Sequence, residues 1–277
     1  MNARLLFILL LFTIGALWYI IGYWRRKAGE AAFAAARLTE KSEERERYCR
    51  LAVMAGHREA CRMFCLLHPE RFDGHSPHKP FKLRGIRISF YGYYYPSRYN
   101  ALLNDEQRAF CHSIYQFKQG DIHGIEFFKT CMNALQLKKR PYHIMFMPCS
   151  NWIKYGQRFK RLDWYIGKHR QDLTSGLYDV DICDARESLH EAKGGERILE
   201  RNYLITGKIK GKEIIIIDDV LTTGQSVVDY KEEIERCGGK VVAAIFYGKT
   251  LSMPSMLLVQ IHVWGNHIAH IIERMTK

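Results

Sequence analysis

EIIIIDDVLTTGQS, residues Glu213 to Ser226, is the most informative segment of the chain. Its isoleucine run is apolar without alternation, which is typical of a strand buried on both faces of a parallel sheet. Two carboxylates, Asp218 and Asp219, follow at the carboxyl end of that strand, where open α/β sheets bind ligands. A short Thr/Gly loop then leads into a helix. The segment therefore predicts a ligand site at the end of a buried strand.

The chemistry of this segment suits a sugar phosphate. Its loop supplies backbone N–H groups and hydroxyls at a helix N-terminus, which favour a phosphate group. The loop residues are Thr222, Thr223, Gly224, Gln225 and Ser226. The two carboxylates can accept hydrogen bonds from vicinal sugar hydroxyls, and they place negative charge near a ribose C1 that becomes cationic as its leaving group departs. A Walker A loop is excluded here because the segment lacks Gly-Lys-Ser/Thr.

Further strands and helices alternate around this segment. Apolar strands are expected at 143–147 and 241–247, and an aromatic strand or hairpin at 81–95. Helices are expected at 105–118, 122–135, 152–168 and 227–236. Because buried strands alternate with helices, the predicted fold class is α/β with a parallel sheet covered on both faces.

The segment 213–226 resembles the phosphoribosyl-pyrophosphate (PRPP) motif of type I phosphoribosyltransferases. The chain is similar in particular to the ComF-like (competence protein F) subgroup, with a likeness that covers roughly Arg87 to Thr250. The other segments that carry the likeness are FYGYYYPSRYNALL (90–103), IYQFKQGD (114–121), HIMFMPCS (143–150) and ERNY (200–203). The resemblance implies a phosphoribosyltransferase fold that binds PRPP, transfers its phosphoribosyl group to an unidentified acceptor and releases pyrophosphate.

The resemblance also implies roles for particular positions. Asp218 and Asp219 would bind the ribose hydroxyls, and the loop Thr222–Ser226 would bind the 5′-phosphate. The pyrophosphate would lie on a second loop made of Pro148, Cys149, Ser150 and Asn151. A flexible loop closes over the pyrophosphate in such enzymes, and its basic candidates here are Arg186, Lys193 and Arg197. Mg²⁺ is implied as a cofactor held through substrate and water, with no direct protein ligand.

Departures from the family pattern leave alternatives open. The family's Arg-Gly-aromatic-Asn-Gln segment is here RFKRLDW, Arg158 to Trp164, and its Pro-Val-Pro is reduced to Pro148. Thr222 stands where purine-type relatives have an acidic residue that assists the base, so the general base is unidentified. The alternatives are a non-catalytic PRPP or nucleotide sensor and a competence-like protein that handles nucleic acid.

The N-terminus predicts a membrane anchor. Leu5 to Trp24 reads LLFILLLFTIGALWYIIGYW and carries no charge. About 20 helical residues span the roughly 30 Å of a hydrocarbon core. The basic residues 25–27 follow the segment, which predicts a single-pass protein with its catalytic domain in the cytoplasm. The alternative is a signal peptide cleaved near the alanines at 31–36.

The rest of the chain divides by composition. The expected parts are an anchor with its basic flank (1–27), a helical hairpin region (28–70), a linker (71–80), the phosphoribosyltransferase domain (81–250) and a C-terminal extension (251–277). The hairpin resembles one tetratricopeptide-like unit and cannot bury its apolar face alone, so it should pack on the chain or bind a protein or nucleic-acid partner. Gly15 and Gly22 would allow two N-terminal helices to pack as a homodimer.

Composition narrows the class of protein. The chain has 277 residues and is 47% hydrophobic, which excludes a disordered chain and a disulfide mini-protein. Its 42 Lys and Arg exceed its 29 Asp and Glu, giving a formal charge of +13 that favours anionic ligands. Basic clusters at Lys138–Arg140 and at Arg158, Lys160 and Arg161 are interpreted as solvated faces, with contacts to lipid head groups or phosphates as the alternative. The eight cysteines show no CxxC pair and indicate reduced thiols.

Overall fold

The computed structural model describes residues 3–183, 202–206 and 208–276, with side chains from residue 10 onward. The chain forms two compact units. The first comprises Met1–Gly74, Ala101–Leu103 and Ser252–Lys277, and the second comprises His75–Asn100 and Asn104–Leu251. The C-terminal segment of the chain therefore belongs to the same unit as its N-terminal segment.

The second unit is built on a six-stranded sheet of order β1-β2-β8-β7-β3-β4. Its strands are β1 (Phe81–Leu83), β2 (Ile86–Tyr94), β3 (Tyr142–Phe146), β4 (Leu173–Ser175), β7 (Glu213–Leu221) and β8 (Lys240–Thr250). Within this six-stranded sheet of described strands, β1 and β2 pair antiparallel and all other neighbours pair parallel. A separate antiparallel pair joins β5 (Val180–Ile182) and β6 (Tyr203–Ile205). The prediction of an α/β fold with a mostly parallel sheet is confirmed.

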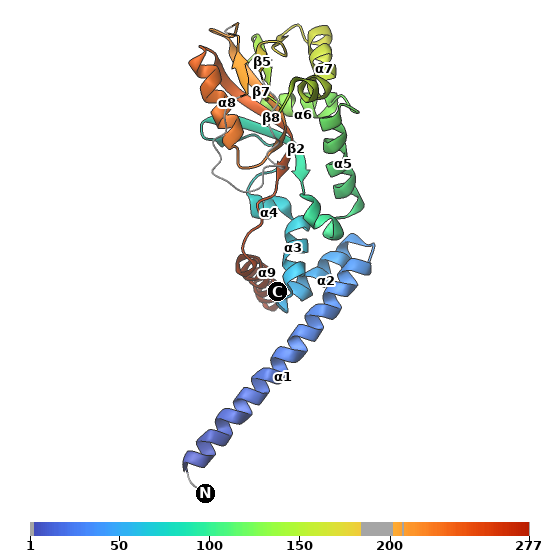
Figure 1. Ribbon diagram of the computed structural model, residues 1–277. Coiled ribbons are helices and arrows are strands. Elements are labelled where there is room, and N and C mark those ends of the chain that lie inside the picture. The colour runs from blue at the N-terminus through green and yellow to red at the C-terminus, as the bar shows by residue number, and fades with distance from the viewer. Residues whose placement is uncertain (1–2, 184–201, 207, 277) are drawn as a thin grey trace. The chain divides into compact units, whose positions relative to one another are not determined.

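Helices cover both faces of this sheet, with α8 on one side and α5, α6 and α7 on the other (Figure 1). Their bounds are α5 (Asp105–Gln119), α6 (Ile125–Leu135), α7 (Trp152–His169) and α8 (Gln225–Arg236). A 3-10 helix at Ser97–Leu102 lies between β2 and α5 in the chain. Ile215 and Ile217 of β7 join the core cluster that holds Phe117, Phe127 and Phe159. Because the isoleucines are buried on both faces, β7 shows no polar alternation.

Strand β7 is longer than its isoleucine run. Its ladder with β8 continues past the acid pair to the register partners Leu221 and Lys249. Asp218 and Asp219 therefore lie inside the last part of the strand and not after it. The ladder hydrogen bonds fix their backbone, so their side chains project from a rigid element.

The first unit is helical. Its helices are α1 (Ala3–Leu38), α2 (Ser42–Met54), α3 (Arg58–Leu67), α4 (Pro69–Asp73) and α9 (Met256–Met275). Helix α9 packs on α2 and α3 and buries Val259 and Val263. The facing helices α2 and α3 bury Cys49, Cys61 and Cys65. The C-terminal helix thus covers an apolar surface that the α2–α3 pair cannot bury alone.

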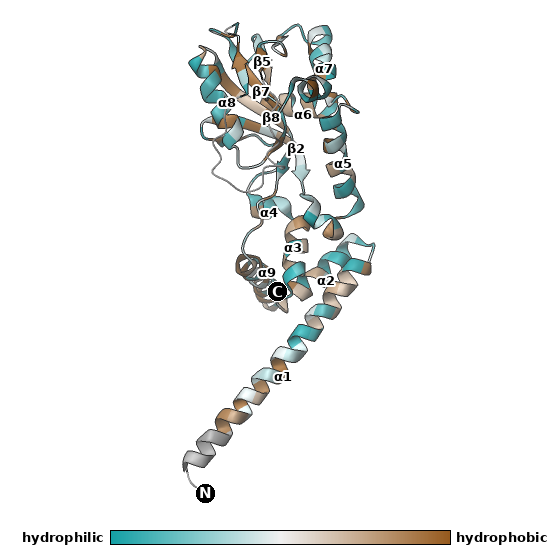
Figure 2. Cartoon of the chain, in the orientation of Figure 1, coloured by the Kyte–Doolittle hydropathy of each residue, from teal (hydrophilic) through white to brown (hydrophobic). Residues whose placement is uncertain are grey.

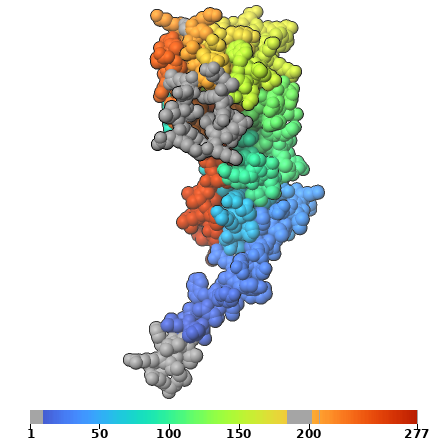
Figure 3. All heavy atoms as spheres, viewed as in Figure 1, coloured from blue at the N-terminus to red at the C-terminus, as the bar shows by residue number. Residues whose placement is uncertain are grey.

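The prediction of a membrane anchor at Leu5–Trp24, and with it of a single-pass membrane protein, is wrong. No helix among the described residues has an apolar stretch long enough to cross a bilayer. Figure 2 shows that the described part of α1 is mainly apolar toward its N-terminal side and carries hydrophilic residues farther along. Figure 3 shows the described N-terminal part of α1 as a rod of side chains, with Phe12 76% exposed.

Candidate functional site

Two neighbouring strands bring the predicted loops together. Strands β3 and β7 are parallel partners with Phe146 opposite Ile217. Beyond the ladder, the Met147 N–H still donates to the carbonyl of Ile217, at 2.9 Å. The loop that follows β3 and the acid pair at the end of β7 therefore lie at the same edge of the sheet. This is the edge where parallel α/β sheets bind ligands.

The acid pair is buried and ion-paired. The side chains of Asp218 and Asp219 are only 13% and 9% exposed. Arg158 of α7 places Nη1 2.6 Å from Asp219 Oδ2 and 3.9 Å from Asp218 Oδ1. Lys118 of α5 places Nζ 3.6 Å from the same oxygen of Asp219. Two carboxylates and two basic side chains thus form one charge cluster at the site.

Burial shifts the titration of Asp218. The pKa of Asp218 is raised to about 7, first by burial and then by the charge of Asp219, although Arg158 opposes the rise. Its Oδ1 accepts a hydrogen bond from the Asp219 N–H at 2.8 Å, which holds the carboxyl group in place. Near neutral pH, Asp218 can therefore accept a hydrogen bond from a sugar hydroxyl when ionised, or donate one to it when protonated.

The loop after β7 has the features of a phosphate cradle. The side chains of Thr222, Thr223 and Ser226 are exposed, while Gly224 is buried. Gly224 has φ 81° and precedes the first residue of α8. A side chain there would be strained, and its Cβ would collide with Leu83 from β1. Glycine is therefore required by both the conformation and the packing.

A hairpin turn reaches this loop. Arg84 lies between β1 and β2 with φ 45°. Its Nη1 donates to Gln225 Oε1 at 2.6 Å, and Gln225 Nε2 in turn donates to Asp229 Oδ1 at 2.6 Å. The β1–β2 turn and the start of α8 are thus held together by side-chain hydrogen bonds as well as by packing.

The loop after β3 is held from two directions. Pro148 and Cys149 are buried, and the Asn151 side chain accepts from the Lys154 N–H at 2.9 Å, so it caps α7. Asn202 Nδ2 donates to the carbonyls of Cys149 and Ser150 at 3.3 and 3.2 Å. Burial raises the pKa of the Cys149 thiol to about 12, so this thiol stays neutral. The backbone of this predicted pyrophosphate loop is therefore well supported.

The second unit contains a segment that matches a known family. Residues 170–250, from β4 to β8 and including the acid pair and the phosphate cradle, match the model described as the phosphoribosyl transferase domain. This part of the chain is similar to phosphoribosyltransferases. The match confirms the broader resemblance of Glu213–Ser226 to phosphoribosyltransferases.

Two relatives of the domain match over short segments. An orotate phosphoribosyltransferase of Sulfolobus acidocaldarius is 42% identical over 52 residues, which is 19% of this chain and 23% of that protein. An adenine phosphoribosyltransferase of Clostridium acetobutylicum is 38% identical over 64 residues, which is 23% of this chain and 36% of that protein. The chain thus matches about a quarter and about a third of the length of these two relatives.

The sheet unit differs from the sequence-based expectation at two basic residues. Arg158 was assigned to a solvated basic face or to lipid or phosphate contacts, and its side chain is only 16% exposed and lies on the acid pair. Lys118 had no predicted role. The available signals were the first residue of RFKRLDW, which retains the family's arginine, and the lysine of IYQFKQGD. The remaining predicted positions, Arg186, Lys193 and Arg197, lie outside the described residues.

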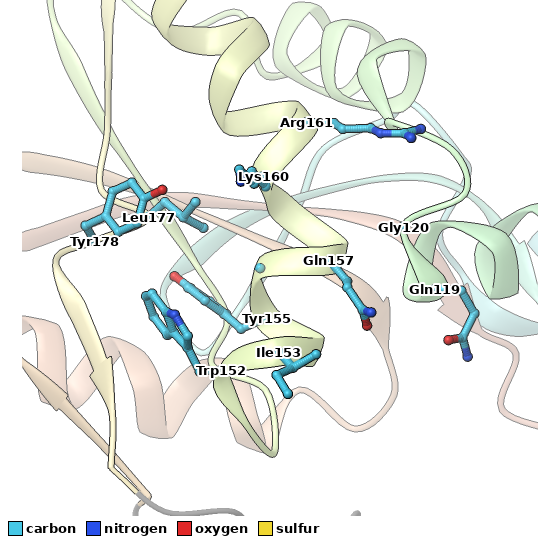
Figure 4. A pocket seen from close by; sticks show the side chains of 11 residues that line it. Gln119, Gly120, Trp152, Ile153, Tyr155, Gln157, Lys160, Arg161, Leu177 and Tyr178 are labelled. Atoms are coloured by element: carbon cyan, nitrogen blue, oxygen red, sulfur yellow. The ribbon is translucent and has the colours of Figure 1, made fainter.

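A groove runs along the exposed face of α7, with a volume of about 480 Å³. Figure 4 shows Trp152 and Tyr155 side by side on one side of it, with Lys160 and Arg161 farther along the helix. The two aromatic rings stack at 5.4 Å between centroids. The groove begins directly after the loop 148–151, but its described lining does not include the acid pair.

The residues around the acid pair do not offer a divalent cation a set of direct protein ligands. Among residues 3–183, 202–206 and 208–276, no group of three or more His, Cys, Asp or Glu is placed to hold a metal ion. The two carboxylates that face the site already pair with Arg158 and Lys118. A cation beside them would meet two positive side chains, whereas Mg²⁺ prefers free oxygen ligands.

Proposed function

We propose that this protein binds PRPP and transfers its phosphoribosyl group to an acceptor with release of pyrophosphate. The observation that carries the proposal is the acid pair and Thr/Gly loop of β7, which lie within the matched residues 170–250. The loop after β3 lies beside them at the same edge of the sheet. The likeness to the ComF-like subgroup is part of the proposal and rests on the segments 90–103, 114–121, 143–150 and 200–203.

Each part of the site has a separate task in this reaction. The carboxylates of Asp218 and Asp219 bind the ribose hydroxyls and orient C1. The loop Thr222–Ser226 holds the 5′-phosphate through backbone N–H groups and hydroxyls. The loop Pro148–Asn151 holds the pyrophosphate. A bond then forms between the acceptor nucleophile and C1, while the C1–O bond breaks and pyrophosphate leaves with the electron pair.

The test is a calorimetric titration of the full chain with PRPP in the presence of Mg²⁺. The wild-type protein should bind, and Asp218→Asn with Asp219→Asn should lose at least about 100-fold in affinity, because two hydrogen bonds to charged groups are worth about 1.5–3 kcal/mol each. The matched control is Asp105→Asn, a carboxylate of α5 that is 98% exposed. Equal affinity of the double variant and the wild type would contradict the site assignment.

Turnover needs a second measurement. Pyrophosphate release should be followed with a panel of acceptors that includes orotate and adenine, because the two relatives are named for them. Binding without release for any acceptor would favour a PRPP sensor. If the protein does not bind PRPP but binds single-stranded nucleic acid in a salt-dependent way, the competence-like alternative is favoured.

A further inference from the structure

We propose that Arg158, assisted by Lys118, takes the place of a divalent cation at this site, so that the protein binds PRPP without Mg²⁺. The inference depends on the proposed function, since it concerns the same ligand. It departs from the expectation of Mg²⁺ that the family resemblance implies. It concerns binding of an anionic sugar diphosphate and makes no claim about turnover.

The first support is the position of the Arg158 guanidinium. Arg158 lies on α7 next to Phe159, a side chain fully buried in the core of the sheet unit. This packing aims Arg158 at the acid pair, where Nη1 reaches both Asp219 Oδ2 at 2.6 Å and Asp218 Oδ1 at 3.9 Å. The basic group is therefore delivered by a rigid helix and not by a mobile surface side chain.

The second support is an unused donor. Arg158 Nε is buried and has no hydrogen-bond partner among the described residues. A buried N–H without a partner costs free energy unless something else satisfies it. A guanidinium offers several N–H donors in a fixed plane, which suits phosphate oxygens. The orphan donor beside the acid pair is consistent with a phosphate or diphosphate oxygen as its missing partner.

The third support is the balance of charge. Bare carboxylates next to a phosphate and a pyrophosphate would repel the ligand, and a divalent cation is one way to neutralise such repulsion. Here the two carboxylates face two basic side chains, with Lys118 Nζ 3.6 Å from Asp219 Oδ2. An arginine stays protonated at any physiological pH. The two basic side chains thus balance the charge of the two carboxylates and remove the repulsion that bare carboxylates would exert on the ligand.

A merely structural salt bridge is a weaker explanation. Removing two charges from water costs about as much as their attraction returns, so a buried ion pair is weak evidence for stability. Hydrophobic residues at these positions would serve the fold equally well. The cluster lies at the ligand edge of the sheet, which points to a role in binding.

The experiment is a calorimetric titration of the full chain with PRPP, once with Mg²⁺ and once with EDTA. The wild-type affinities in the two buffers should agree within about threefold. Arg158→Gln should lose at least about tenfold in affinity for PRPP in EDTA, equivalent to about 1.4 kcal/mol. Mg²⁺ should restore part of that affinity. Arg158→Lys should lose less than Arg158→Gln, because the charge is kept. The matched control Lys160→Gln removes one positive charge from an exposed position on the same helix. Its affinity for PRPP should be the same with Mg²⁺ and with EDTA.

The outcomes separate this inference from the proposed function. Wild-type binding that requires Mg²⁺ would overturn the inference and leave the proposed function standing. No binding in either buffer would overturn both. Arg158→Gln binding PRPP in EDTA as tightly as the wild type would show that Arg158 does not replace the cation. Lys118→Gln, at a side chain 31% exposed, provides a second variant that should fold if Arg158→Gln does not, and it should also weaken binding in EDTA.

Discussion

Asp218 titrates far from its ordinary range. Burial and the neighbouring charge of Asp219 raise its pKa from 3.8 to about 7 in the folded chain. Between these two pH values the native state binds more protons than the unfolded state, so stability falls as pH rises from about 4 to about 7. The ionised carboxyl group therefore costs stability at neutral and alkaline pH.

Replacing Asp218 by Asn should remove this cost. The asparagine Oδ1 can still accept the hydrogen bond from the Asp219 N–H, so the local backbone is retained. We expect the melting temperature to rise at pH 8, by about 2–4 °C for each kcal/mol regained, and the gain to vanish near pH 4, while PRPP binding weakens. Scanning calorimetry at both pH values measures this. Destabilisation of the same size at pH 4 and pH 8 would show that Asp218 has no raised pKa.

The sequence identifies the residues of the motif but not their partners. Asp218, Asp219 and the Thr/Gly loop are contiguous, so a local pattern is enough to find them. Arg158 and Lys118 come from helices far away in the chain, and only the packing of α5 and α7 brings them to Asp219. A periodicity argument places charged residues on the solvated face of a helix, and for Arg158 that argument fails.

At the scale of elements, the start of α8 depends on one glycine. Gly224→Ala should destabilise the chain by about 1–3 kcal/mol, from a left-handed φ of 81° and a collision with Leu83. In a Leu83→Ala background, Gly224→Ala should cost less than it does in the wild type. The difference between the two costs is the steric part. Urea unfolding gives the free energies of this cycle.

Gly156 of α7 is the matched control for that substitution. A Cβ at Gly156 meets no atom within 4 Å, and its backbone is helical. Gly156→Ala should therefore be neutral or stabilise by up to about 1 kcal/mol. Equal losses at both glycines would contradict the conformational argument for Gly224.

Strand and helix positions in the sheet unit follow from apolar runs and turn residues. The expected helix at 152–168 is α7, and the strand at 241–247 lies inside β8. The extension of β7 to Leu221 was not predictable, because polar residues at 218 and 219 end the apolar run although the ladder with β8 continues. Strand ends depend on the partner strand, which a single sequence does not show.

At the scale of the whole molecule, the two units should respond differently to ligand. PRPP at 100 times its dissociation constant adds about 2.7 kcal/mol to the unit that binds it. We expect two unfolding transitions, of which only the one belonging to the sheet unit rises, by about 5–10 °C. Val263→Asp, at a buried side chain of α9, should lower only the other transition. A single transition that shifts as a whole with PRPP would contradict two independent units.

Hydropathy alone misjudged the N-terminal segment. Leu5–Trp24 contains no charge, yet the described part of α1 is not long and apolar enough to cross a membrane. Hydropathy also gives no partner for the C-terminal segment, whose α9 packs on α2 and α3 of the same unit. Such a long-range pairing depends on complementary apolar surfaces rather than on any local pattern.

The return of α9 to the helical unit has a consequence for synthesis on the ribosome. Helices α2 and α3 are made early, but the helix that covers them begins only at Met256. The roughly 190 intervening residues take on the order of 10 to 40 seconds to translate at about 5–20 residues per second. The sheet unit is complete at Leu251 and can fold first. The nascent chain therefore exposes the apolar surface of α2 and α3 for most of its synthesis, which makes this surface a natural place for a chaperone to act.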